Sequence, residues 1–193
     1  MNVLFQPFPE TVRVNGEDFR IVTDFREWIK LHEFLQNTER FTAGTLQIVL
    51  EWYIDPPPKD YREAVRALQD FMAASELYES NLQDEEQGGR QRQPKDVFSF
   101  EQDAACIYSA FWAVYGIDIT SIPYLHWWQF LTLFEGLPSD TEIKERIYYR
   151  GIDLNEIEDK AERKRIKKIR QKIAIRQKHR RKKMDDYEIG AMF

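Results

Sequence analysis

Alternating apolar and polar residues over residues 12–21 predict a β-hairpin near the N-terminus. The alternation lies on both sides of the pair Asn15-Gly16. Asn and Gly tolerate the positive φ angles that a tight two-residue turn requires, so this pair is expected to form the turn. No other segment shows a clear strand pattern, and the remaining predicted elements are helices.

Helices are predicted where apolar residues recur at intervals of three and four. A short apolar segment ends before the prolines at 56–58, which cannot continue a helix. Another helix is expected to start at Ser121, with Pro123 in its first turn, and to end at Gly136. Five pairs with capping-box spacing predict the other helix starts: Asp24 with Glu27, Asp60 with Glu63, Ser99 with Gln102 (ending at Gly116), Ser139 with Glu142 (ending at Gly151), and Asp153 with Glu156.

Residues 98–134 are the most aromatic part of the chain, with 11 of its 27 aromatic residues and three of its five tryptophans. The helix predicted after Ser121 is apolar on nearly every side, which is typical of a central buried helix. We therefore expect most of these aromatic residues to form the core. A part that stays exposed would instead bind a partner, and the candidates for such a patch are Tyr124, His126, Trp127 and Trp128.

The formal net charge of −5 conceals two oppositely charged segments. Residues 160–183 contain 14 Lys and Arg and one acid, a net charge of +13, whereas residues 1–159 have a net charge of −15. The basic segment is expected to belong to one long helix that runs from the cap at Asp153 to about Lys183. Its apolar stripe is too narrow to enter a core, so this helix should project from the body.

Together these patterns predict a mainly α-helical protein with an N-terminal β-hairpin and a long projecting C-terminal basic helix. The expected organisation is a helical domain over residues 1–150 and a basic helical extension over residues 151–193. Residues 81–96 combine acids, glutamines, two glycines and a proline, without a large apolar residue after Leu82. That composition predicts a flexible loop within the helical domain.

The basic helix has three interpretations: it binds an acidic partner protein, it binds nucleic acid, or it is a solvated tail. Cations at this density would neutralise phosphates. However, the segment has no aromatic residue to stack on bases and no recognisable DNA-binding motif, and the acidic body would repel a polyanion. A protein partner is the preferred interpretation, and the candidate residues for it are Lys164, Lys168, Arg176 and Arg180.

Catalytic chemistry finds little support in the sequence, which contains no glycine-rich phosphate loop, nucleophile elbow or zinc-ligand pair. The three histidines lie on separate predicted elements, and the single cysteine, Cys106, lies on an apolar helix face without an evident base. We therefore expect no enzyme, no metal site and no cofactor. A lone cysteine and the lack of a long apolar run favour a cytoplasmic protein that does not use a membrane.

Several motifs follow one another in the second half of the chain: Phe100-Glu101-Gln102-Asp103, Ile107-Tyr108-Ser109-Ala110-Phe111, Tyr115-Gly116-Ile117-Asp118, Ile122-Pro123-Tyr124-Leu125-His126-Trp127-Trp128 and Gly136-Leu137-Pro138. In these motifs the chain resembles the bacteriophage gene-product-fifteen family, whose members are encoded in the tail-morphogenesis region of tailed phages and prophages. The resemblance covers most of the chain, and the Pro-Tyr-Leu-His-Trp-Trp segment is its most specific part.

The resemblance implies a role in building the phage tail. Genes between those of the major tail protein and the tape-measure protein commonly encode tail assembly chaperones, which keep the long tape-measure helix soluble. The resemblance implies no catalytic residues. We therefore expect a non-catalytic tail morphogenesis protein of the host cytoplasm that binds the tape-measure protein or other tail proteins, with homo-oligomers as a further expectation. The alternatives are a nucleic-acid-binding protein and a structural component of the tail.

Overall fold

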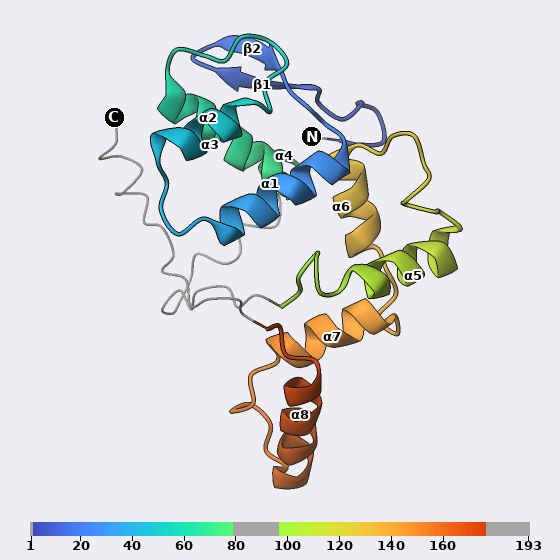
Figure 1. The fold of residues 1–193 in the computed structure, drawn as a ribbon. Coiled ribbons are helices and arrows are strands. Elements are labelled where there is room, and N and C mark those ends of the chain that lie inside the picture. The colour runs from blue at the N-terminus through green and yellow to red at the C-terminus, as the bar shows by residue number, and fades with distance from the viewer. Residues whose placement is uncertain (1, 79–96, 177–193) are drawn as a thin grey trace. The chain divides into compact units, whose positions relative to one another are not determined.

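The computed structural model describes residues 2–78 and 97–176, which contain one two-stranded antiparallel hairpin and eight helices (Figure 1). The expected mainly helical fold class with an N-terminal hairpin is confirmed. The described residues group into two compact units, 2–78 with 124–131 and 97–123 with 132–176. The organisation into residues 1–150 and 151–193 stays a prediction. The loop expected at 81–96 lies outside the described residues.

The first unit begins with the hairpin of β1 (Thr11–Val14) and β2 (Glu17–Arg20). Its turn has the predicted geometry, because Asn15 and Gly16 adopt φ angles of 50° and 89°. Alternate residues of β1 point to opposite faces, and Val12 and Val14 are buried while their neighbours are exposed. The sequence alternation therefore specifies which face of the hairpin packs on the helices.

The helices of the first unit are α1 (Phe25–Asn37), α2 (Ala43–Leu50), α3 (Tyr61–Met72) and α4 (Ser75–Tyr78). Two predicted caps are confirmed. The Asp24 carboxylate accepts the backbone N–H of Arg26, and the Asp60 carboxylate accepts that of Glu63. The buried side chains of this unit include Ile21, Phe25, Trp28, Leu31, Val49, Tyr53, Val65, Leu68, Phe71, Trp128 and Phe130.

The helix predicted from Ser121 begins later, as α6 (Trp127–Glu135). The residues before α6 are extended, because their backbone pairs with the segment that precedes α1. The Phe25 N–H donates to the Leu125 carbonyl over 2.9 Å, and the Trp127 N–H donates to the Thr23 carbonyl over 2.8 Å. The aromatic residues of α6 are buried, whereas Gln129, Thr132 and Glu135 are exposed along one side, so the helix is less buried than predicted. Its residues 127–131 belong to the first unit and its residues 132–135 to the second.

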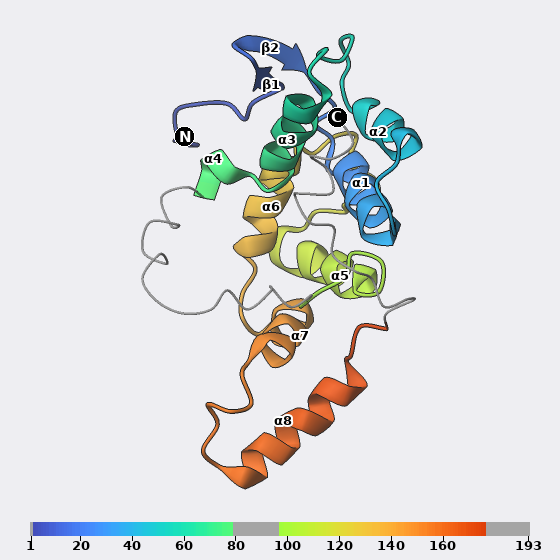
Figure 2. The ribbon, with the colours of Figure 1, turned by 90° about the vertical axis from the view of Figure 1, so that its left-hand side faces the viewer.

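The second unit contains α5 (Ala104–Tyr115), α7 (Glu142–Gly151) and α8 (Lys160–Lys172) (Figure 2). The predicted end of α5 is confirmed, because Gly116 adopts the left-handed conformation with φ of 65°. Three predicted starts are wrong. The N-caps are Asp103 for α5, Thr141 for α7 and Asp159 for α8, instead of Ser99, Ser139 and Asp153. Asp153 instead accepts the N–H of Asn155, which is a local turn contact.

The basic helix α8 is shorter than predicted, since it ends at Lys172 and Ile173 is its C-cap. Most of its residues are exposed, as expected for a projecting helix. However, its narrow apolar stripe does pack: Ile166 is only 3% exposed, and α8 contacts α7. Arg170 strengthens this contact by donating to the backbone carbonyls of Tyr149 and Ile152. The helix is therefore anchored along one side.

Candidate functional site

Two of the aromatic candidates, Trp127 and Trp128, are core residues of the first unit, with side chains 3% and 2% exposed. Their polar atoms are also satisfied internally. The Trp127 indole N–H donates to the Met72 carbonyl over 2.9 Å, and the Trp128 indole N–H donates to the Phe71 carbonyl over 2.7 Å. The expectation that these residues form a partner-binding surface is corrected, because neither side chain is accessible.

His126 is also buried, and its ring holds one tautomer. Its Nδ1 accepts the backbone N–H of Trp128 over 3.0 Å, so the proton lies on Nε2, which faces the Pro9 carbonyl at 3.0 Å. The ring stacks on Phe8 with centroids 5.1 Å apart. Burial lowers the pKa of His126, although the contact with Pro9 opposes this shift. The burial and the hydrogen bonds of the ring fit a neutral structural histidine. Tyr124, the fourth aromatic candidate, is exposed, unlike the other three.

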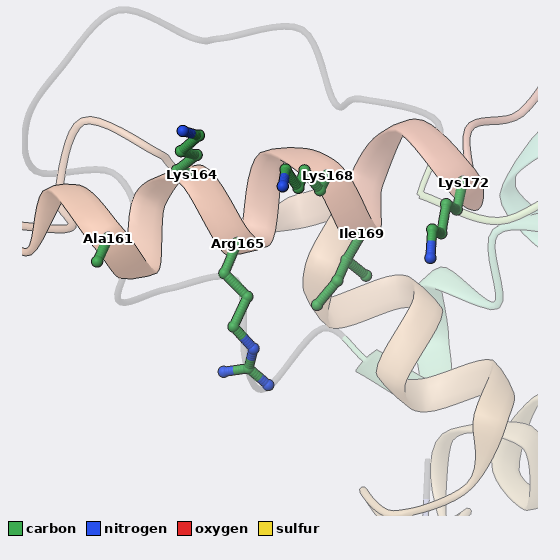
Figure 3. Close-up of a pocket in the computed structure, with 6 residues that line it drawn as sticks. All are labelled: Ala161, Lys164, Arg165, Lys168, Ile169 and Lys172. Carbon is green, nitrogen blue, oxygen red and sulfur yellow. The ribbon is translucent and has the colours of Figure 1, made fainter.

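The basic candidates Lys164 and Lys168 lie on the exposed side of α8 (Figure 3). They belong to a set of residues at intervals of three and four that line one shallow concavity, and we call this set the basic face of α8. Its members are Ala161, Lys164, Arg165, Lys168, Ile169 and Lys172. The face therefore combines four cations with two apolar side chains, within a helix whose formal charge is +7.

Most of the cations on the basic face have no counter-ion among the described residues. Arg165 pairs with Glu162 at 2.9 Å, and this contact raises the pKa of Arg165. Lys164, Lys168 and Lys172 form no ion pair with any residue in the ranges that the structure describes. Three adjacent ammonium groups without a partner give this side of α8 a positive potential that favours an acidic ligand.

The other two basic candidates are not part of this face. Arg176 lies after the helix, where its backbone N–H and carbonyl both bond to the side-chain amide of Gln102 over 2.9 Å. These contacts attach the end of the described chain to the turn before α5. Arg180 lies outside the described residues.

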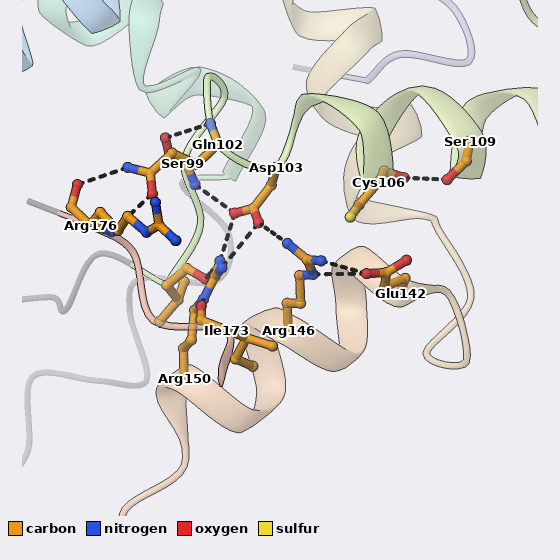
Figure 4. Close-up of polar contacts among 11 residues, drawn as sticks. Ser99, Gln102, Asp103, Cys106, Ser109, Glu142, Arg146, Arg150, Ile173 and Arg176 are labelled. Carbon is orange, nitrogen blue, oxygen red and sulfur yellow. Dashed lines mark hydrogen bonds and ion pairs between the residues drawn. The ribbon is translucent and has the colours of Figure 1, made fainter. Parts of the chain in front are cut away.

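A buried ionic cluster joins the start of α5 to α7, and the sequence analysis did not predict it (Figure 4). Asp103 is fully buried, and its carboxylate accepts two hydrogen bonds from Arg150 at 2.6 and 3.0 Å and one from Arg146 at 2.8 Å. The backbone N–H of Ser99 donates a fourth hydrogen bond at 3.0 Å. Burial by itself would raise the pKa of Asp103, but these donors outweigh it and the pKa is lowered.

Arg150 connects this cluster to α8. Its remaining donors reach the Ile173 carbonyl over 2.7 Å and the Val97 carbonyl over 3.0 Å, so one guanidinium joins three chain segments. The cluster thereby fixes where the basic helix ends. A sequence signal existed, because Arg146 and Arg150 are four residues apart and share one side of a helix.

The described residues show no arrangement for metal or membrane chemistry. They contain no group of three His, Cys, Asp or Glu side chains placed to hold a metal ion. Burial raises the pKa of the Cys106 thiol, which disfavours the reactive thiolate. Among residues 2–78 and 97–176, no helix is both long and apolar enough to cross a bilayer. The most distinctive accessible feature is the basic face of α8.

Comparison with known proteins gives a family. Neither a curated protein nor a solved structure matches the chain significantly. The family model described as Bacteriophage Gp15 protein matches residues 4–175, which include both compact units and the whole of α8. The chain therefore belongs to the bacteriophage Gp15 family.

Proposed function

We propose that this phage protein is a non-catalytic tail morphogenesis protein, a tail assembly chaperone that binds the tape-measure protein. Membership of a phage family supports a phage-related role. The observation that supports a binding role most directly is the basic face of α8, where Lys164, Lys168 and Lys172 flank Ala161 and Ile169. The tape-measure protein is the partner that the family resemblance implies.

The chemistry of this face suits one kind of ligand, an amphipathic helix with acidic residues along its apolar stripe. Apolar contact with Ala161 and Ile169 would supply part of the affinity, as in other helix-binding surfaces. The unpaired lysines would attract the acids and accelerate encounter. A helix bound in this way would hide part of its apolar stripe from other copies of itself, which is the action expected of a chaperone.

Co-expression with the tape-measure protein tests this proposal. We expect the two proteins to co-purify and the soluble fraction of the tape-measure protein to rise. The double variant Lys164→Glu/Lys168→Glu should abolish both effects, because it reverses charge on the basic face. The matched control is Lys160→Glu/Lys167→Glu, which makes the same charge change on α8 at two lysines that do not line the concavity and should preserve binding. Absence of co-purification together with no gain in solubility would overturn the proposal.

Nucleic-acid binding is the second candidate, supported by the same unpaired lysines. Titration with duplex DNA at several salt concentrations separates the two candidates. Binding to phosphates predicts an affinity that falls steeply with salt, with a slope that decreases when Lys164 and Lys168 are neutralised. If α8 instead binds a protein, its affinity for DNA should be weak. Neutralising lysines on any side of α8 should then change that affinity equally. Mass spectrometry of purified particles tests whether the protein is instead a component of the tail.

A further inference from the structure

The second unit has another concave surface, between α5 and the start of α7. The α5 residues that line it are Ser109, Ala110, Ala113 and Val114, three of them small, and Pro138 and Thr141 line it before the start of α7. The concavity has a volume of about 460 Å³. Small side chains allow a packed helix to approach closely, since the distance between helix axes depends on the side chains at the contact. We call this surface the α5–α7 groove.

Two carboxylates line the α5–α7 groove, and both are exposed. Glu142 accepts hydrogen bonds from Arg146, so its charge is partly compensated. Asp140 forms no ion pair with any of the residues 2–78 or 97–176. The groove therefore combines small and apolar side chains with two carboxylates. A helix that fits it has small or apolar residues in its centre and cations beside them.

The chain itself contains such a helix, the basic face of α8, and we propose that α8 of one copy docks in the α5–α7 groove of a second copy. The cations Lys164 and Lys168 match the acids of the groove, and Ala161 and Ile169 match its apolar residues. The two helices also have similar lengths, 12 residues in α5 and 13 in α8. This inference does not rest on the proposed function.

The docking takes place between copies because α8 is held elsewhere in its own chain. Ile166 is buried, and Arg170 bonds to the backbone at Tyr149 and Ile152. The basic face is exposed in that position. Since the groove and the basic face are different surfaces, a docked pair still presents one free groove and one free basic face. The association is therefore heterologous and continues to larger assemblies or closes into a ring.

Sedimentation velocity of the full chain over a range of concentrations tests the docking. We expect a mass that grows with concentration and shrinks at high salt, because screening weakens the charge pairs. Two variants remove one surface each: Lys164→Gln/Lys168→Gln neutralises the basic face, and Ala113→Arg fills the groove. Each alone should weaken self-association by about tenfold or more, since about 1.4 kcal/mol corresponds to a factor of ten.

Mixing the two variants is the decisive measurement. The Ala113→Arg chain keeps its α8 and the other variant keeps its groove, so the mixture should form a 1:1 complex that grows no further. Lys160→Gln/Lys167→Gln removes two cations of α8 that do not line the concavity and should associate like the unaltered chain. A chain that stays monomeric at every concentration, an equal loss in this control, or association that survives in both single-surface variants would overturn the docking.

Discussion

The tryptophans of α6 and the lysines of α8 occupy opposite environments. Trp127 and Trp128 are nearly inaccessible, and each indole N–H donates to a backbone carbonyl of its own unit. Lys164 and Lys168 are exposed and form no ion pair with a described residue. The comparison separates two roles. Side chains whose apolar and polar groups are satisfied within the chain stabilise the fold, whereas cations without internal partners remain available for a ligand.

The largest expected effect comes from the core side of this comparison. Trp128→Ala should lower the free energy of unfolding by about 3–5 kcal/mol, because it leaves a cavity and removes the indole hydrogen bond to the Phe71 carbonyl. The matched control is Trp112→Ala on α5, whose side chain is 55% exposed and should change stability by less than about 0.5 kcal/mol. Denaturant titration measures both. Equal losses would contradict the assignment of Trp128 to the core.

The buried ionic cluster should give a loss almost as large. Asp103→Asn removes the charge that compensates Arg150, which is itself 5% exposed. Breaking a buried ion pair in this way costs about 3 kcal/mol or more. The matched control is Glu162→Gln, which breaks the exposed pair with Arg165 and should leave the unfolding curve unchanged. If Asp103→Asn left the unfolding curve unchanged, the cluster would not fix the end of α8.

A smaller effect is expected from pH. The pKa of His126 is lowered in the folded chain, so the unfolded chain binds the proton more readily. Stability attributable to His126 is then complete above its unfolded pKa of about 6.5 and is lost as the pH falls below that value. Unfolding midpoints measured between about pH 7.5 and pH 5 should decrease, and His126→Gln should flatten that decrease. An unchanged slope in this variant would contradict the neutral buried histidine.

The smallest effect on stability is expected at the basic face. Lys164→Glu/Lys168→Glu should leave the denaturation curve superimposable on that of the unaltered chain, since neither lysine has an internal ion pair to lose. Binding of an acidic partner helix should nevertheless be lost in the same sample. A substantial loss of stability would show instead that these lysines stabilise the fold, and the contrast with Trp128 would disappear.

Local patterns predicted much of the fold because their causes are local. The turn at Asn15-Gly16 depends on two residues that tolerate positive φ, and the caps at Asp24 and Asp60 bond to backbone groups two or three residues away. The segment before α6 was predicted as helix, because Ser121 and Pro123 form a good local start. Its backbone is extended only because residues near Thr23 supply hydrogen-bond partners from a distant part of the chain.

Among the functional candidates, too, some follow from local sequence and others depend on distant parts of the chain. The charge of the basic segment is a property of composition, and the exposure of Lys164 and Lys168 agrees with it. The aromatic composition of residues 124–128 was compatible with either a core or a patch, and burial against Phe71 and Met72 decided for the core. Asp103 was missed since its partners lie more than 40 residues away, a separation at which spacing gives no information.

By itself, the sequence determined the mainly helical class, the hairpin, several helix ends and the separation of charge, because each depends on neighbours along the chain. Only the tertiary structure decided that α8 ends at Lys172 and that Ile166 anchors it. Tertiary structure also placed an acidic groove beside α5 and left Lys164, Lys168 and Lys172 without an ion pair among the described residues. The physical reason is that burial and ion pairing depend on which distant side chains meet.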